Sequence, residues 1–300
     1  MHIDPLIALA GLLVGFVVGL TGMGGGALTT PLLVLVFRVQ PLAAVSSDLV
    51  AAVVMKPVGG AVHLRSGTVN RQIVGWLVLG SVPAAFSGAL LLHALGDGSG
   101  VQNAIKIALG VALIAGAGGI VFRAITTSSR SVSAAAGPEH PSRWHIALTV
   151  VIGIAGGLIV GLTSVGSGSI MIVLLMLLYP RLSTSELVGT DLVQAIPLVA
   201  AAAAGHLLFG DFRLGLTVSL LIGSIPGVYV GARLSARANL RFIRPALAVV
   251  LLLSGAKLLD ASNLELGLLF VAVTAGVVIV WSWRRRPWLV RPGAVAAIEP

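Results

Sequence analysis

The sequence predicts an all-α integral membrane protein built from two inverted-topology repeats and one extra C-terminal helix. Each repeat is expected to contain a glycine-broken helix pair, re-entrant or half-crossing, followed by three transmembrane helices. Three observations lead to this prediction: the composition, two glycine-rich breaks and an internal repeat. Of the 300 residues, 57% are hydrophobic and only 10% are charged, whereas about 25% are charged in soluble domains. We therefore expect a multi-pass protein of the cell membrane, surrounded by the lipid bilayer.

Composition also excludes several functions. The sequence has no cysteine, which excludes disulfides, thiolate metal sites and thiol nucleophiles. It has no P-loop and no HExxH motif, and we expect no cofactor and no metal. An intramembrane hydrolase would need Ser164 or Ser167 near His206, but no GxSxG elbow is present, so we expect no enzyme. The net charge of +9 includes no basic run with interleaved aromatic residues, and a nucleic-acid partner is not expected.

A membrane-spanning helix needs about 20 mostly apolar residues. The first apolar run, 5–22, has no basic flank before it and is interpreted as a membrane element rather than a cleaved signal. It precedes the break "GMGGG" and a short apolar piece, 27–37. The run 145–163 likewise precedes "SVGSGS" and a short piece, 169–180. Such short pieces fit re-entrant or half-crossing segments. Full-length candidates are 43–63, 73–93, 104–122, 187–208, 214–234, 242–260 and 265–283.

A polar, serine-rich linker at 124–144 divides the chain. We expect a first membrane repeat at 1–123, a cytoplasmic linker at 124–144 and a second membrane repeat at 145–260. The extra helix and a basic cytoplasmic tail then occupy 261–300.

The two halves resemble each other in sequence. "GFVVGLTGMGGG" at 15–26 aligns with "GLIVGLTSVGSG" at 157–168, and "SDLV" at 47–50 aligns with "TDLV" at 190–193. "GSVP" at 80–83 aligns with "GSIP" at 223–226. The same landmarks in the same order indicate a duplicated unit, which is typical of secondary transporters.

Positive charges indicate that the repeats are inverted. If the arginine-rich tail is cytoplasmic, the arginine-bearing loops 64–72, 235–244 and 181–186 and the linker are cytoplasmic too. The outer loops then hold only Arg38 and Arg213, as the positive-inside rule requires. This arrangement predicts an external N-terminus and a cytoplasmic C-terminus.

The glycine breaks are the first candidate binding elements. Backbone N–H groups exposed where a half-helix begins form anion sites, and broken helices meet near the midplane in inverted-repeat transporters. Helix packing is the alternative explanation for glycines at four-residue spacing, such as Gly11, Gly15 and Gly157. The candidate substrate-binding residues of the two breaks are Thr21, Gly22, Gly24, Gly25 and Gly26, and Thr163, Ser164, Gly166, Ser167 and Gly168.

Two aspartates occupy equivalent positions near the starts of long helices, Asp48 and Asp191. Each either caps its own helix or a neighbouring break, or lines a cavity and exchanges a coupling proton. Hydroxyls and an amide lie beside them. The further candidates for substrate binding are Ser46, Ser47, Thr190 and Gln194.

Lys56 lies in the middle of the apolar segment 43–63, immediately before Pro57. It either contacts an anionic substrate or pairs with Asp191 or a backbone carbonyl. The aligned residue of the second half is Val199.

Two histidines, His63 and His206, also occupy equivalent positions in the halves. We expect both at helix ends in the membrane interface, with a proton relay as the alternative.

Together these elements resemble the TauE/SafE family of sulfite and organosulfonate exporters. The similarity rests on "GLTGMGGG…TTPLL", "SSDLV", "GTDLV" and the duplicated "GSVP…G" helix, and it spans roughly residues 7–260. The resemblance implies transport of small sulfur-containing or organic anions driven by an ion gradient. Two departures are Ser167, where the first half has a glycine, and Val173, where it has Pro31.

The functional hypothesis is a secondary transporter of a small anion, sulfite or an organosulfonate, that works by alternating access and is coupled to a proton. A passive anion channel and a non-transporting membrane partner subunit are the alternatives.

Overall fold

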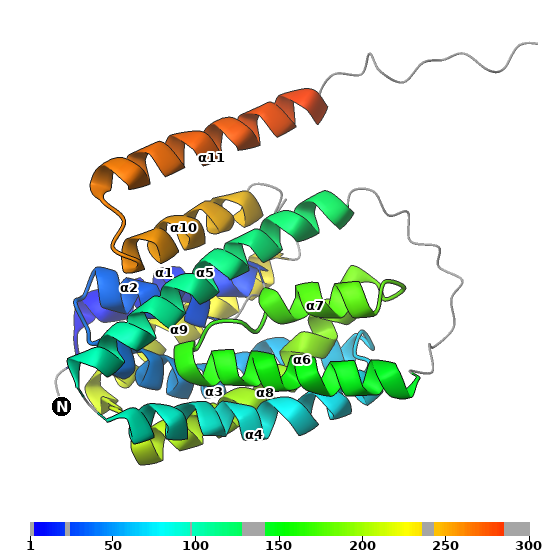
Figure 1. Ribbon diagram of the computed structural model, residues 1–300, viewed down its shortest axis with the longest axis horizontal. Helices are drawn as coiled ribbons and strands as arrows, with labels where there is room; N and C mark the ends of the chain where they lie inside the picture. Colours follow the sequence, from blue (N-terminus) through cyan, green and yellow to red (C-terminus); the bar gives the residue numbers. More distant parts are fainter. Residues whose placement is uncertain (1–2, 22–24, 97, 128–141, 236–242, 285–300) are drawn as a thin grey trace, which may run out of the picture. The chain divides into compact units, whose positions relative to one another are not determined.

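A computed structural model describes residues 3–21, 25–96, 98–127, 142–235 and 243–284, and every structural statement below concerns these residues. Within them, all the regular elements are helices (Figure 1). The helices are α1 (Pro5–Thr21), α2 (Gly26–Leu35), α3 (Pro41–Arg65), α4 (Arg71–Leu95), α5 (Ser99–Thr127), α6 (Arg143–Thr163), α7 (Ile170–Leu178), α8 (Thr184–Phe209), α9 (Leu214–Ser235), α10 (Ile243–Leu258) and α11 (Asn263–Arg284). The all-α prediction is confirmed, and every predicted segment corresponds to a helix.

The chain divides into two compact units, residues 1–260 and 261–300. The first unit contains both halves of the repeat. The second unit contains α11, the extra helix expected from the sequence.

Each half contains one pair of helices separated by a break. The second members, α2 and α7, have 10 and 9 residues. At about 1.5 Å per residue, each is roughly 15 Å long or shorter, whereas the hydrocarbon core of a membrane is about 30 Å thick. The prediction that these pieces are too short to cross a membrane is therefore confirmed.

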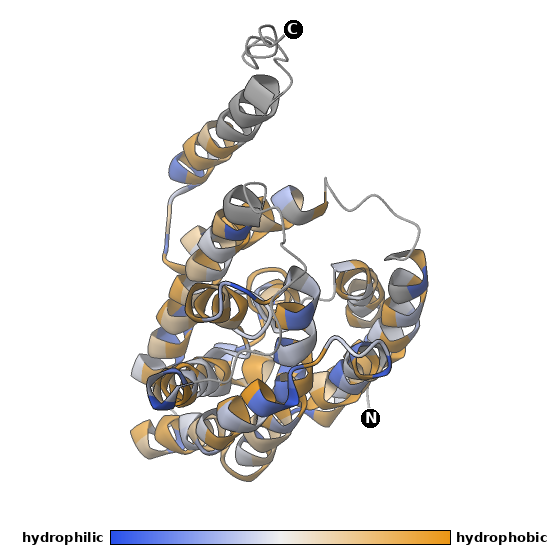
Figure 2. Cartoon of the chain, turned by 90° about the vertical axis from the view of Figure 1, so that its right-hand side faces the viewer, coloured by the Kyte–Doolittle hydropathy of each residue, from blue (hydrophilic) through white to orange (hydrophobic). Residues whose placement is uncertain are grey.

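Among the described residues, six helices are long and apolar enough to cross a membrane: α3, α4, α5, α6, α8 and α9. The described part of α10, with 16 residues, is shorter than the expected segment 242–260. Figure 2 shows hydrophobic residues over much of the chain, and many large hydrophobic side chains are exposed, among them Leu79, Val111, Ile154, Leu208 and Ile222. The first unit therefore has the apolar exterior that a lipid environment requires.

The two halves interlock through their first and fourth helices. Helix α1 packs along α9 of the other half, and α6 packs along α4. A Cβ atom added to Gly11 would collide with the backbone of Leu220, and one added to Gly153 would collide with the backbone of Leu77. The two contacts are related by the repeat: Gly11 of the first half and Gly153 of the second are equivalent, and each contacts the equivalent leucine of the other half. The packing interpretation of these glycines is confirmed, because glycine allows the close approach of two backbones.

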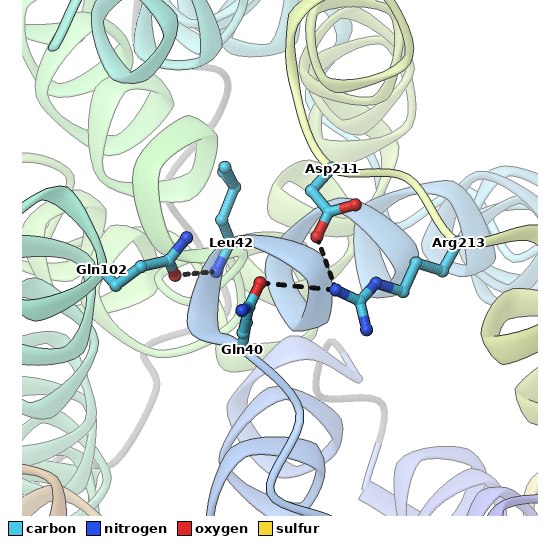
Figure 3. Close-up of polar contacts among 5 residues, drawn as sticks. All are labelled: Gln40, Leu42, Gln102, Asp211 and Arg213. Atoms are coloured by element: carbon cyan, nitrogen blue, oxygen red, sulfur yellow. Dashed lines mark hydrogen bonds and ion pairs between the residues drawn. The ribbon is translucent and has the colours of Figure 1, made fainter. Parts of the chain in front are cut away.

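Polar contacts at one end of the bundle join the two halves (Figure 3). The Arg213 guanidinium donates hydrogen bonds to Gln40 at 3.3 Å and to Asp211 at 3.0 Å. Beside them, the Gln102 side chain accepts a hydrogen bond of 3.1 Å from the backbone N–H of Leu42. The loops before α3 and α9 therefore lie at the same end, as the predicted topology requires. The side of the membrane that this end faces stays a prediction.

Candidate functional site

The second break has a backbone that only a glycine-rich sequence adopts easily. Helix α6 ends at Thr163, and Ser164 has a left-handed φ of 60°. Gly166 and Gly168 follow with φ values of 132° and 91°, which side chains disfavour. The Thr163 hydroxyl supports the turn by donating to the Ile159 carbonyl at 2.7 Å. The predicted break therefore exists and leaves helical geometry at the expected place.

The two breaks meet each other inside the first unit. A Cβ atom added to Gly26, the first residue of α2, would collide with the backbone of Ser164. Gly25 lies beside the Asp48 side chain, whose Oδ1 would be 4.0 Å from an added Cβ. The candidates Gly22 and Gly24 lie outside the described residues.

Asp48 connects the two breaks. Its Oδ2 accepts a hydrogen bond of 3.0 Å from Thr30 of α2 and one of 2.6 Å from Ser164 at the end of α6. The carboxylate is 1% exposed. Because α3 begins at Pro41, Asp48 lies beyond the first turn and does not cap its own helix. Own-helix capping is therefore wrong, and the aspartate instead receives hydroxyl groups from two broken helices.

Lys56 extends from α3 to the second break. Its ammonium group donates a hydrogen bond of 2.5 Å to the Ser167 hydroxyl. The residue is 7% exposed, and Asp191 and Asp48 are both close enough to attract its charge. A buried ammonium therefore lies at the break, and its hydrogen bond goes to a serine rather than to a carboxylate.

Asp191 is the equivalent carboxylate of the second half, and its surroundings differ from those of Asp48. Its Oδ1 accepts a hydrogen bond of 3.0 Å from the Gln194 amide, and the backbone N–H of Gly168 approaches the carboxyl group. Its Oδ2 is buried and has no hydrogen-bond partner. Gln194 is fixed in turn by Ser81 of α4, which donates to its Oε1 at 3.3 Å. One oxygen of a buried carboxyl group is therefore left free.

His206 lies in the last turn of α8, as expected, and its side chain is fully buried within the protein. Its place in the membrane interface stays a prediction. Its Nδ1 shares a hydrogen bond of 2.8 Å with Ser46, and its Nε2 lies 2.7 Å from the Gly161 carbonyl. These two partners satisfy both ring nitrogens away from water. His63 is partly exposed in the last turn of α3 and contacts Thr68 at 2.9 Å, so its expected position at a helix end is confirmed.

These contacts form one buried polar cluster, which consists of Asp48, Lys56 and Asp191 with their partners Thr30, Ser164, Ser167, Gly168 and Gln194 and with Ser81. Four further candidates lie outside this cluster. The Thr21 hydroxyl donates to the Val17 carbonyl of its own helix, and Thr190 accepts a hydrogen bond from the Asn70 backbone. Ser46 is occupied by His206. The hydroxyl of Ser47 is buried and has no hydrogen bond.

Two residues of the cluster were not among the sequence candidates. Thr30 belongs to the "TTP" stretch after the first break, and Ser81 belongs to the duplicated "GSVP" element. Both residues lie in sequence elements that mark the repeat or follow a break, and this was the feature from which they could have been chosen. Nothing in the sequence indicated which hydroxyl would reach which buried carboxylate.

The first unit also has apolar hollows away from this cluster. One is lined by parts of α1, α2 and α10, including Val17, Leu32 and Val250. Another is lined by α5 and α7, including Phe122 and Leu174. Neither offers a charged group for an anion, and the buried polar cluster remains the candidate site.

The chain is similar to known membrane transporter proteins. The model of the family described as "Sulfite exporter TauE/SafE" matches residues 7–258. The chain is 39% identical over 261 residues to "Probable membrane transporter protein YjnA" of Bacillus subtilis (strain 168), covering 84% of this chain and 98% of that protein. It is 28% identical to "Probable membrane transporter protein YdhB" of the same organism, covering 83% and 99%. No solved structure matches the chain.

Proposed function

Since this chain belongs to the TauE/SafE sulfite exporter family of membrane transporters, we propose that it is a secondary carrier of small sulfur-containing anions. Sulfite or an organosulfonate is the proposed substrate, bound where the two helix breaks meet. The observation that carries the proposal is the buried Lys56 ammonium, which donates a hydrogen bond to Ser167 within the second break.

The chemistry of this place suits an oxyanion. A fixed positive charge, serine hydroxyls and backbone N–H groups at the start of a short helix are the donors that bind such anions. Lys56 supplies the charge, and Ser164 and Ser167 supply hydroxyls. Gly168 supplies a backbone N–H directed into the cluster.

Alternating access between two inverted halves is the proposed mechanism. The charged residues of the cluster are all 7% exposed or less, so the described conformation is closed at this place. The two halves form equivalent interfaces, α1 with α9 and α6 with α4, and internal symmetry of this kind is typical of alternating-access carriers. A passive channel would need a continuous polar path, and the burial of the cluster favours the carrier.

Uptake into proteoliposomes tests the proposed function. Purified protein is reconstituted and offered labelled sulfite, sulfate, thiosulfate or sulfoacetate, with and without an imposed pH gradient, and the leak into protein-free vesicles is subtracted. We expect saturable uptake of at least one sulfur anion that responds to the gradient. Absence of uptake of all four anions by folded protein would contradict the proposed substrate class. Uptake that never saturates would instead favour the channel.

A further inference from the structure

The free oxygen of Asp191 distinguishes the two buried carboxylates. Oδ2 of Asp48 accepts two hydroxyl hydrogen bonds, at 2.6 and 3.0 Å, and donated hydrogen bonds of this kind stabilise a carboxylate in its ionised form. Oδ2 of Asp191 is equally buried and has no hydrogen-bond partner. Leaving a buried acceptor without a donor is unfavourable, and more so when the acceptor is charged. Such a group in a native protein needs an explanation, and for a carboxylate oxygen a proton or ion that occupies it at some stage is one.

The charge of the cluster indicates what that ligand is. Its three buried charged residues are Asp48, Asp191 and Lys56. When all are ionised, two carboxylates and one ammonium leave one net negative charge, which repels an anion. If one carboxyl group takes up a proton, a singly charged anion restores the original net charge. The empty and the loaded site then carry the same charge.

The position of Asp191 connects proton uptake to anion binding. Its charge acts on the Lys56 ammonium and attracts it, and the Gly168 N–H approaches the same carboxyl group. Neutral Asp191 would no longer attract the Lys56 ammonium and would hold the Gly168 N–H less strongly, so both would be more available to an anion. The charged groups that act on Asp191 from the surrounding elements are Lys56 of α3 and Arg123 of α5. On the other side, Met171 and Ser81, which contact its partner Gln194, carry no titratable group.

We infer that Asp191, and not Asp48, is the carboxyl group that takes up one proton each time the carrier binds its anion. The proton adds to Oδ2, converting the carboxylate to the neutral acid. It leaves on the side where the anion is released. The carrier is then a proton–anion symporter, whose net direction follows the two gradients. This inference rests on the proposed function and assigns the coupling residue within the same site.

The test compares wild-type protein with Asp191→Asn and with its symmetry-related control Asp48→Asn. Proteoliposomes contain a pH-sensitive dye and are given labelled sulfite, or the panel anion that wild-type protein accumulates. We expect an inward anion gradient to acidify the lumen of wild-type vesicles. Asp191→Asn should exchange internal for external anion without acidification. Asp48→Asn should transport more weakly, but the anion that enters should still bring protons.

Anion binding to the purified variants in detergent provides the second measurement. Because neutral asparagine mimics the protonated acid, Asp191→Asn should still bind the anion. Wild-type affinity should fall by up to about tenfold per pH unit as the pH rises, and the affinity of Asp191→Asn should not. Titration of sulfite itself is common to all variants and cancels in the comparison.

Three outcomes would overturn the assignment: acidification that accompanies uptake by Asp191→Asn, loss of anion binding by folded Asp191→Asn, or proton-free exchange by Asp48→Asn. Anion uptake by wild-type protein without proton movement would also overturn it, while leaving the proposed anion carrier intact. If wild-type protein moves no anion of the panel, it is the proposed function that fails.

Discussion

Asp48 of the first half accepts a hydrogen bond of 2.6 Å from Ser164, the residue directly after α6 of the second half. The same oxygen accepts from Thr30 of the first half. One carboxylate therefore binds the broken helices of both halves. A change in its hydrogen bonds alters the contact between the breaks directly.

Loss of the Asp48 donors should lower stability. Ser164→Ala and Thr30→Ala each remove one hydroxyl from a buried carboxylate, which we expect to cost about 1–3 kcal/mol. Ser87→Ala is the control, because Ser87 is exposed and bonds only to the Pro83 carbonyl of its own helix. Thermal unfolding in detergent measures the difference. A Ser164→Ala protein that melts with the Ser87→Ala control would contradict the importance of this contact.

Lys56 should be necessary for anion binding and dispensable for folding. Lys56→Met removes the buried positive charge at the second break and should abolish binding of the transported anion. Lys106→Met is the matched control, since Lys106 is partly exposed and pairs with Asp260 away from the cluster. Equilibrium binding and a melting curve are measured on both variants. Unchanged affinity in Lys56→Met would remove Lys56 from the site.

The interlocking glycines should tolerate no side chain. Gly15→Ala forces a methyl group against the Ser224 backbone, and Gly157→Ala does the same against Ser81. Overpacking of this kind costs about 1–3 kcal/mol. Gly75→Ala is the control, because a Cβ atom at Gly75 meets nothing within 4 Å. Both interface variants should melt at lower temperature than the control, and equal melting temperatures would argue against the close packing.

The two histidines should differ in their effect on stability. His206→Leu leaves Ser46 and the Gly161 carbonyl without their buried partner, so we expect a loss of about 1–3 kcal/mol. His63→Leu should cost less, because His63 is partly exposed and water can replace its contact to Thr68. The melting temperatures of the two variants measure this difference in stability. A larger loss for His63→Leu would reverse the roles assigned here.

The inverted topology can be tested with single cysteines, because the chain has none of its own. Gln40 precedes α3, and Arg181 lies at the equivalent place before α8. We expect an impermeant thiol reagent added to intact cells to label Gln40→Cys and leave Arg181→Cys unlabelled. Gly98→Cys is the positive control, because Gly98 lies close before Gln102, which contacts Leu42 at the same end as Gln40, and a Cβ atom at Gly98 meets nothing within 4 Å. Labelling of both test residues from one side would show parallel repeats.

The sequence predicted the helices and their breaks because both depend on local composition. Apolar runs of about 20 residues form spanning helices in lipid, and "SVGSGS" cannot continue a helix without cost. The close packing of Gly11 and Gly15 was likewise predicted from their spacing. These properties need no knowledge of which helices become neighbours.

The contacts within the candidate site depend on tertiary structure and could not be predicted in the same way. The burial of His206 follows from the approach of Gly161 and Ser46, which lie 45 and 160 residues away in the sequence. The same is true of the Lys56–Ser167 contact, which spans 111 residues. The two aspartates have nearly the same sequence context. They differ because Thr30 and Ser164 both donate hydrogen bonds to Asp48 in the folded structure.

The reciprocal packing of α1 on α9 and α6 on α4 has a consequence for the integrity of the molecule. Each half gives its first helix to the other half, as the protomers of a domain-swapped dimer do. A half produced alone would leave the glycine faces of α1 and α4, or of α6 and α9, without their partners. The two halves are therefore a single folding unit, and separately produced halves should be stable only when they are made together.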